Sequence, residues 1–525
     1  MHFASDEAVL AKKKLKATLV AFVGAMALRV ASQYAVGVLW DWHIFAWLRA
    51  VDLVTTIAVA AESWGWFLEW SPALIGSGML VGSNVALSYF AGSILAWAVV
   101  GPYLVSHGRA FGHKIVTNDT SWAELMSYSG MTDTFANAGH PSPRYWLLWP
   151  GIACMLAVSF AELACQYRIF WAFLRSAIKL SKSTVLIMLT NRRERYAYTI
   201  LETTDGNLRS IKTLNINGDI AQWMWAPGLA ATTIATCLVT NLLFGMSIAE
   251  TTLALTLAFL LSLVAIQAAG ATDTAPLTAL SKVSQIVFGA TTWSAEPTSM
   301  AMAQRLNLIG GSLTNIGASQ AVDVMGDFRV GFLLRTSPRL QYAAQLIGTA
   351  VAAIVAPAVF VLFATAYPCI LDISESSSTS CEFPGPSVAA WRAVAVAATQ
   401  STLPVPASSL VFSLVFAIVG STTVLVRQFI TKGKPAQYIP NFMIMALAFT
   451  IPSPQYGIAM LMGAVFARVW RWRRPENFDS LGSAVAAGLI AGEGIGGTIN
   501  SILAILGIGG GKWGVKFGCP AGQCR

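Results

Sequence analysis

One interrupted apolar stretch holds the residues best suited to chemistry. Within residues 261–289, LSLVAIQAAGATDTAPLTALSKVSQIVFG, an apolar pattern is broken by Gly270, Asp273 and Pro276. In hydrocarbon every backbone N–H and C=O needs a partner, so an irregular segment there must lie inside protein or against a water-filled cavity. A carboxylate at that depth is costly and usually functional. Broken helices near the midplane hold substrate and coupling ion in many secondary transporters. The alternative is a polar loop at the membrane face, with Asp273 as a helix cap.

Other polar residues in apolar sequence extend this predicted pathway. Glu493 lies between glycines in GLIAGEGIGG, and a carboxyl group in a partly dry site can exchange a proton near neutral pH. For Asn84 and Ser88 the alternative is hydrogen bonding between helices. For the charged segment that begins at Gln320 we expect a connecting loop at the cytoplasmic face, because surface ion pairs are individually weak, and the alternative is a gate whose Asp–Arg pairs exchange between states. The predicted pathway residues for substrate or protons are Asn84, Ser88, Gln267, Thr272, Asp273, Gln285, Gln320, Asp323 and Glu493.

The elements that must position these residues are membrane helices. The chain has 525 residues, of which 55% are hydrophobic and 11% charged, whereas soluble proteins average about 25% charged residues. Apolar runs long enough to span a bilayer recur along the sequence. We therefore predict an all-α polytopic membrane protein, a single transporter domain over residues 1–525, with roughly 10–13 transmembrane or re-entrant helices and broken helices near the midplane. Residues 71–102 are long enough for two short spans or a re-entrant hairpin.

Charge sets the predicted orientation. The formal net charge is +9, but the basic residues cluster in short connections, which indicates cytoplasmic loops rather than nucleic-acid binding. On this rule residues 171–220 form a basic cytoplasmic loop and residues 367–388 an outer loop. Two possible disulfides then fall on the outer side, in pairs Cys369 with Cys381 and Cys519 with Cys524. The plasma membrane is expected rather than an internal membrane.

Motifs for enzymes and pumps are missing from the sequence. It contains no GxSxG, HExxH or Walker A pattern, and its five histidines are scattered. Neither the histidines nor the seven cysteines have metal-site spacing. We expect no enzymatic activity, no cofactor and no metal site. The expected partners are the lipid bilayer and a small-molecule substrate.

Seven segments, taken together in chain order, resemble the oligopeptide transporter superfamily, which includes the yellow-stripe metal–chelate carriers. They are SPALIGSGMLVG, SPRYWLLWPG, GATDTAPL followed by KVSQIVFG, QAVDVMGDFRVG with SPR and AQLIG, AYPCI, PSVAAWRAVA and AAGLIAGEGIGG. The match covers nearly the whole chain, and the motif sequences most resemble those of fungal members. Thr272, Asp273, Pro276 and Glu493 fall on family motifs.

This resemblance implies proton-coupled uptake of oligopeptides or small peptide-like compounds. The alternative substrate is a metal–chelate complex of the siderophore or nicotianamine kind. Family members carry several more spans before the point where this chain starts, so we expect an N-terminally truncated member. A non-transporting relic of such a carrier is the remaining alternative.

Overall fold

The structure, a computed structural model, describes most of the chain in two compact units. The first unit contains residues 1–159, 292–296 and 355–525, and the second contains residues 160–291 and 297–354. The described residues are 2–50, 55–115, 120–131, 138–165, 167, 201–204, 207–210, 220, 222–272, 277–294, 300–371, 386–400, 405–430, 438–520 and 524. Most of the predicted loop 171–220, and most of the predicted loop 367–388, lie outside this set.

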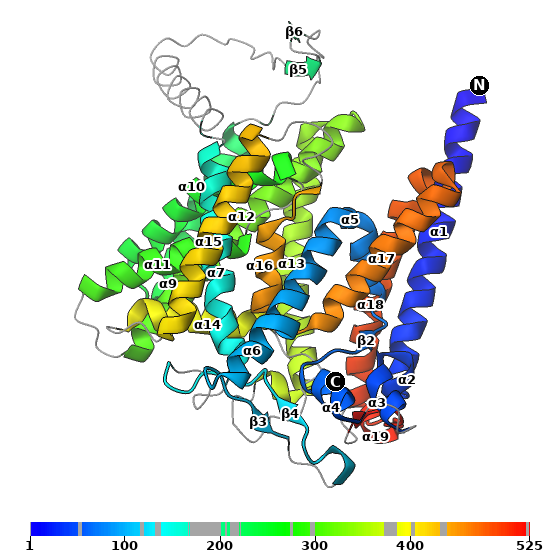
Figure 1. The fold of residues 1–525 in the computed structure, drawn as a ribbon. Helices are drawn as coiled ribbons and strands as arrows, with labels where there is room; N and C mark the ends of the chain where they lie inside the picture. The colour runs from blue at the N-terminus through cyan, green and yellow to red at the C-terminus, as the bar shows by residue number, and fades with distance from the viewer. Residues whose placement is uncertain are drawn as a thin grey trace, which may run out of the picture. The chain divides into compact units, whose positions relative to one another are not determined.

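Helices dominate the described part of the chain (Figure 1). Eight of them are long and apolar enough to cross a membrane, which confirms the prediction of an all-α polytopic membrane protein. Their spans are Val9–Ser32, Pro72–Ser106, Pro143–Glu162, Trp223–Phe244, Ile248–Ile266, Pro338–Ala366, Ala407–Phe429 and Pro475–Ile505. The strands in the described residues form short antiparallel pairs, which are β1 (Asp41–Trp42) with β2 (Leu68–Glu69), β3 (His113–Lys114) with β4 (Met126–Ser127), and β5 (Leu201–Thr204) with β6 (Asn207–Ser210).

The first unit holds most of the helices. They are α1 (His2–Ser32), α2 (Val36–Leu39), α3 (Ile44–Ala50), α4 (Thr55–Ser63), α5 (Pro72–Ile94), α6 (Gly101–Ser106), most of α7 (Pro143–Cys165), α14 (Pro386–Thr399), α15 (Ala407–Leu425), α16 (Phe442–Thr450), α17 (Pro454–Arg473), α18 (Pro475–Ile505) and α19 (Gly510–Trp513). Two π-helical stretches, Leu95–Val100 and Val426–Ile430, extend α5 and α15. Short 3-10 turns occur at Thr120–Trp122 and Pro368–Ile370.

Glycines let α1 and α18 pack closely in the first unit. Gly488, Gly492 and Gly496 recur every four residues along α18. A Cβ atom built on Gly488 would lie 2.5 Å from the carbonyl oxygen of Thr18, and one on Gly496 would lie 2.8 Å from the Cβ of Arg29. Small residues at this spacing are typical of membrane helices whose backbones approach each other directly. Arg29 therefore faces a neighbouring helix.

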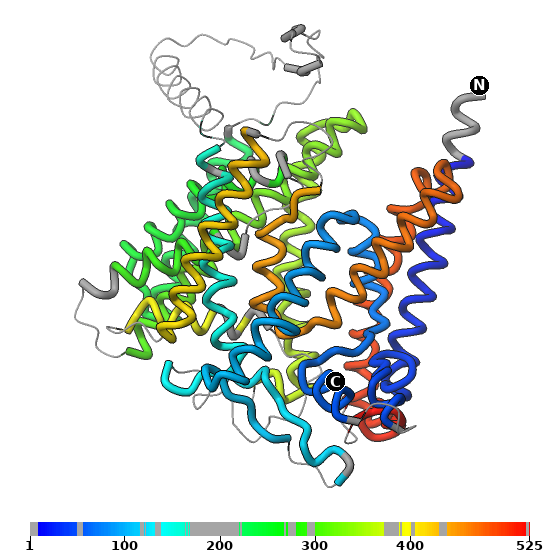
Figure 2. The backbone as a smooth tube through the Cα atoms, in the orientation of Figure 1, coloured from blue at the N-terminus to red at the C-terminus, as the bar shows by residue number. Residues whose placement is uncertain are grey.

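Helix α5 is broken at Gly82. That residue has φ 82° and ψ 170°, a conformation outside the helical region. The arm before the break packs on α18 and α17, and the arm after it packs on α16 and α17. Figure 2 shows the α5 segment as two arms that meet at a bend. The structure thus places a broken helix in residues 71–102, where the sequence allowed a re-entrant hairpin.

The second unit is built around α10, α11 and α12. Its helices are α9 (Gln222–Phe244), α10 (Ile248–Thr272), nearly all of α11 (Leu277–Ser294), α12 (Met300–Leu333) and the first half of α13 (Pro338–Ala366). Met246, Ala254, Phe288 and Leu306 form a buried apolar cluster that joins α10, α11 and α12. The ring of Phe288 lies directly against Gly310, where no larger side chain would fit.

Candidate functional site

A buried polar network connects α11 and α12 in the second unit. The Nζ atom of Lys282 donates to Oε1 of Gln285 at 3.0 Å, and Nε2 of Gln285 donates to Oδ1 of Asn307 at 3.1 Å. Asn307 Nδ2 in turn donates to the backbone oxygen of Gln285 at 2.5 Å. All three side chains are buried, none exceeding 1% exposure. Residues three apart on a helix share a face, which is why Lys282 and Gln285 meet.

A second buried polar contact joins the same two helices. The hydroxyl groups of Ser284 and Thr314 are 2.8 Å apart, and Thr314 also donates to the carbonyl oxygen of Gly310 at 3.0 Å. Both side chains are fully buried. Buried polar groups in hydrocarbon are expensive unless they are paired, and they mark substrate and ion pathways in membrane proteins. A lysine amine beside two amides has donors and acceptors of the kind that bind carboxylate and amide groups.

Glu493 lies on α18, in the first unit. Its Oε2 atom accepts hydrogen bonds from the hydroxyl of Ser71 at 2.8 Å and from the backbone N–H of Ala73 at 2.6 Å. Ser71 is the N-cap residue of α5, where its hydroxyl also accepts a hydrogen bond from the N–H of Leu74 at 3.2 Å. The half-buried carboxylate of Glu493 therefore caps the N-terminus of a neighbouring helix, where the helix dipole favours negative charge.

Asn84 and Ser88 connect α5 to the start of α16. Asn84 Nδ2 donates to the carbonyl oxygen of Ile439 at 3.1 Å, and the backbone N–H of Asn441 donates to the hydroxyl of Ser88 at 2.9 Å. Asn441 is itself the N-cap of α16. This geometry is that of the alternative stated above, hydrogen bonding between helices.

The remaining predicted pathway residues are spread along α10 and α12. Gln320 and Asp323 are exposed on α12, and Gln320 Nε2 donates to Oγ1 of Thr349 at 3.4 Å. Because α12 continues to Leu333, residues 320–333 are helical, and the expectation of a connecting loop from Gln320 onward is wrong for them. Backbone hydrogen bonds continue the helix beyond the apolar part of the sequence. The charged residues of this extension lie on its exposed face.

Three predicted residues have side chains that the structure does not describe. Gln267 lies within α10 and Thr272 is its last residue, but nothing is described beyond their backbone. Asp273 lies outside the described residues, between α10 and α11. Gln285 is thus the one predicted pathway residue of the interrupted stretch whose side-chain contacts the structure describes.

Sequence reasoning missed most of the network. Lys282, Asn307 and Thr314 were not among the predicted pathway residues, although all are fully buried. Asn307, Gly310 and Thr314 follow the spacing of one helix face, i, i+3 and i+7, which is a signal that the sequence contained. Apart from Leu306, the buried residues of α12 are small or polar, namely Ala303, Asn307, Gly310, Gly311, Thr314, Ala318 and Gly331.

One of the two predicted cysteine pairs is joined in the structure. Cys519 and Cys524 are joined by a disulfide, with their Cα atoms 5.2 Å apart. Cys369 is also disulfide-bonded, and Cys381 lies outside the described residues. Cys154, Cys165 and Cys237 are free.

The helical fold and the enclosed polar residues define a polytopic α-helical membrane protein. The chain belongs to the OPT oligopeptide transporter family, whose model matches residues 1–504. This confirms the resemblance drawn from the seven motifs. Members of this family are transporters and not enzymes.

Individual relatives cover most of the chain. It is 26% identical over 482 residues to a rice (Oryza sativa subsp. japonica) protein named "Probable metal-nicotianamine transporter YSL13", which covers 88% of this chain and 60% of the relative. It is 25% identical over 473 residues to a Saccharomyces cerevisiae protein named "Putative oligopeptide transporter YGL114W", which covers 84% of this chain and 59% of the relative. The chain thus spans about 60% of the length of the curated relatives that it matches along most of its length.

Proposed function

We propose that this chain carries small solutes bearing amide and carboxylate groups across a membrane, with protons as the coupling ion. Membership of the OPT family supports the transport of a solute. The observation that carries the proposal is the enclosed Lys282–Gln285–Asn307 network, which offers a cation and two amides inside the second unit. A peptide presents the matching carboxylate and amide groups. Oligopeptides or small peptide-like compounds are therefore the proposed substrates.

A metal–chelate complex is the second candidate substrate. The names of the rice relatives refer to metal–nicotianamine complexes, and the yeast relative's name refers to oligopeptides. A chelate of this kind also presents carboxylates around the metal, so the same buried cation suits it. The two candidates differ in whether uptake requires the metal.

Proton coupling is proposed for the acidic residues in apolar sequence. Asp273 and Glu493 are the candidates, because a carboxyl group shielded from water can alternate between charged and neutral forms. Glu493 accepts two hydrogen bonds as a carboxylate, and protonation would weaken both. On this proposal, protonation of Glu493 loosens the start of α5 from α18.

The test uses the full 525-residue chain reconstituted in liposomes with an imposed pH gradient. We expect labelled short peptides to accumulate against their own gradient, and Lys282→Met to reduce that accumulation at least tenfold. Labelled iron–nicotianamine and zinc–nicotianamine form the second arm. If only the chelates accumulate, the substrate is a metal chelate and not a peptide. If folded protein accumulates neither class, the proposal is wrong and the non-transporting alternative is favoured.

A further inference from the structure

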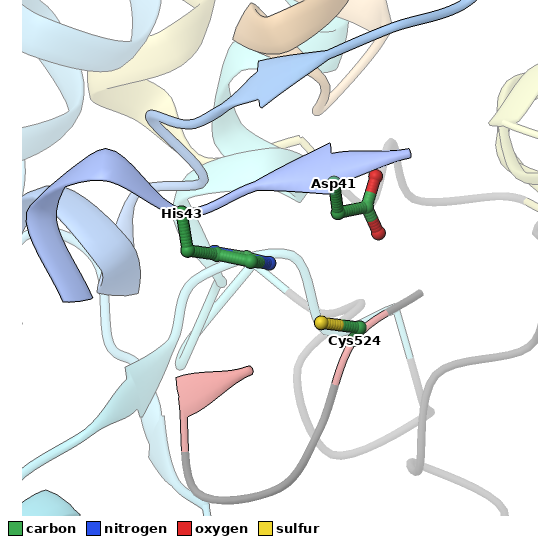
Figure 3. Close-up of side chains that lie close together, drawn as sticks. All are labelled: Asp41, His43 and Cys524. Carbon is green, nitrogen blue, oxygen red and sulfur yellow. The ribbon is translucent and has the colours of Figure 1, made fainter. Parts of the chain in front are cut away.

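Three side chains from opposite ends of the chain meet in the first unit. Asp41 belongs to β1, His43 follows that strand directly, and Cys524 is in the C-terminal tail. One potential metal-ligand atom from each lies within 4.8 Å of the other two. Figure 3 shows Asp41, His43 and Cys524 gathered around one point. Asp41 is 1% exposed and His43 is 5% exposed, so water has little access to either side chain.

The imidazole of His43 is oriented as that of a metal ligand. Its Nδ1 atom lies 2.6 Å from Oε2 of Glu62, whose side chain is only 2% exposed. Its ring lies against Phe67, with ring centroids 4.5 Å apart. The opposite nitrogen, Nε2, is buried and has no hydrogen-bond partner. A histidine that ligates a metal through one nitrogen usually gives the other to a carboxylate, which fixes its ring and its tautomer.

An orphaned buried nitrogen needs a physical explanation. Leaving a buried polar atom unpaired costs about 1–3 kcal/mol, and native proteins tolerate few such atoms. The unpaired nitrogen of His43 belongs to the cluster that also contains the Asp41 carboxylate and the Cys524 sulfur. Imidazole, carboxylate and thiolate are the ligand types that bind zinc. A divalent cation would bind Nε2, which has no hydrogen-bond partner among the described residues.

Cys524 is part of a disulfide, and the redox state of that disulfide determines whether the sulfur can bind a metal ion. The sulfur of Cys524 is bonded to that of Cys519, and only a thiolate is a strong zinc ligand. We propose that Asp41, His43 and Cys524 form a Zn²⁺ site that becomes available when this disulfide is reduced. A dithiol reductant supplies two electrons and two protons, so that two cysteine thiols and the cyclic disulfide of the reductant are formed. Zn²⁺ then displaces the thiol proton of Cys524, and a water molecule completes four-coordination.

The tail remains beside β1 without the disulfide, because other contacts hold it there. The backbone N–H of Val515 donates to the carbonyl oxygen of Tyr34 at 2.8 Å. Phe517 packs edge-on against Trp47, with ring centroids 5.3 Å apart. Gly518 also lies close to Trp47. Reduction therefore frees the Cys524 sulfur while these contacts hold residues 515–518, so the sulfur stays within six residues of an anchored segment.

Two cysteine variants test the site with a matched control. Cys519→Ser and Cys524→Ser both remove the disulfide and leave the same number of thiols, but only Cys519→Ser keeps the proposed ligand. The full chain is purified in detergent without reductant, exposed to Zn²⁺, desalted, and analysed for zinc per chain. We expect one additional zinc in Cys519→Ser, none in Cys524→Ser, and one in the wild type only after treatment with dithiol. Equal zinc retention by both variants would overturn the proposal.

Spectroscopy and a second pair of variants separate ligation from nonspecific binding. Co²⁺ bound to Cys519→Ser should show thiolate-to-metal charge transfer and the intense bands of a tetrahedral ion. Adding His43→Gln to Cys519→Ser should abolish these bands, and adding Glu62→Gln should weaken zinc binding about 10- to 100-fold. If the variants fail to fold, Zn²⁺ should still protect Cys524 of the reduced wild type from alkylation, as read by mass spectrometry. Unprotected Cys524 would contradict the site.

Discussion

One carboxylate oxygen of Glu493, on α18, accepts a hydrogen bond from the backbone N–H of Ala73, at the start of α5, at 2.6 Å. The same oxygen accepts the hydroxyl of Ser71, the N-cap of that helix. The first N–H groups of a helix have no partner within the helix, so an acidic residue from a neighbouring helix satisfies one of them here. The first arm of the broken helix is thereby fixed to α18 by an ionisable group.

Replacing Glu493 separates its capping role from proton coupling. Glu493→Ala leaves the N–H of Ala73 unpaired and should lower the free energy of unfolding by about 1–3 kcal/mol. Glu493→Gln keeps an acceptor and should lose only about 0.3–1 kcal/mol of charge–dipole stabilisation. Thermal unfolding in detergent compares the two variants. If Glu493→Gln folds normally and still shows unchanged pH dependence of uptake, Glu493 caps a helix and does not couple protons.

Lys282→Met tests whether the buried cation serves substrate binding. The substitution removes a desolvated charge while preserving side-chain length, and replacing a buried charge by an apolar residue often costs little stability. Gln285 loses one donor, which should cost about 1–3 kcal/mol. We expect folded protein with at least tenfold lower uptake. Lys512→Met, at an exposed position of the first unit, is the control and should transport like the wild type.

The fold class followed directly from the sequence. Long apolar runs with few charges force helices in a bilayer. The length of residues 71–102 allowed two short spans or a re-entrant hairpin, and the structure breaks the helix there at Gly82. The segment after Gln320 could not be predicted in the same way. Its charges suggested a loop, but helical hydrogen bonding does not depend on an apolar surface, and α12 runs on to Leu333.

A polar contact could be predicted from the sequence only where both partners lie a few residues apart on the same helix. Lys282 and Gln285 are three residues apart, so their meeting on one face of α11 could be derived. The partner Asn307 comes from α12, and its register against α11 is set by the packing of Phe288 on Gly310. Likewise, no local spacing relates His43 to Cys524, which meet because the C-terminal tail returns to β1.

Burial of His113 predicts a pH dependence of stability. Burial lowers the pKa of His113 below its ordinary value of 6.5. Because the unfolded chain then binds more protons than the folded one below that value, the contribution of His113 is fully present above pH 6.5 and is lost as the pH falls through the folded pKa. We expect thermal stability to decline between pH 7.5 and pH 5, and His113→Gln to reduce this decline. An identical decline in the variant would exclude His113 as its source.

Gly82→Ala tests the bend of α5 as a conformational requirement. The φ of 82° and ψ of 170° at Gly82 fall in a region that is essentially restricted to glycine, which costs other residues about 1–3 kcal/mol. A Cβ atom there would meet nothing within 4 Å, so any loss comes from the backbone rather than from packing. Gly326→Ala, which also has open space but lies within the helix α12, should be neutral or slightly stabilising. Equal stability of both variants would contradict a strained bend.

Gly78→Ala tests the opposite case, in which the backbone is helical and the space is filled. A Cβ atom on Gly78 would collide with the carbonyl group of Met460 on α17, and Gly463 on α17 is just as close to Ile75 on α5. Because the obstacles are backbone atoms, the two helices must separate, and overpacking of this kind costs about 1–3 kcal/mol or more. Gly24→Ala on α1 has no atom within 4 Å of its new Cβ and should gain up to about 1 kcal/mol from helix propensity. Melting temperatures of the two variants in the same detergent should therefore move in opposite directions. An unchanged or higher melting temperature of Gly78→Ala would show that α5 and α17 are not packed through these glycines.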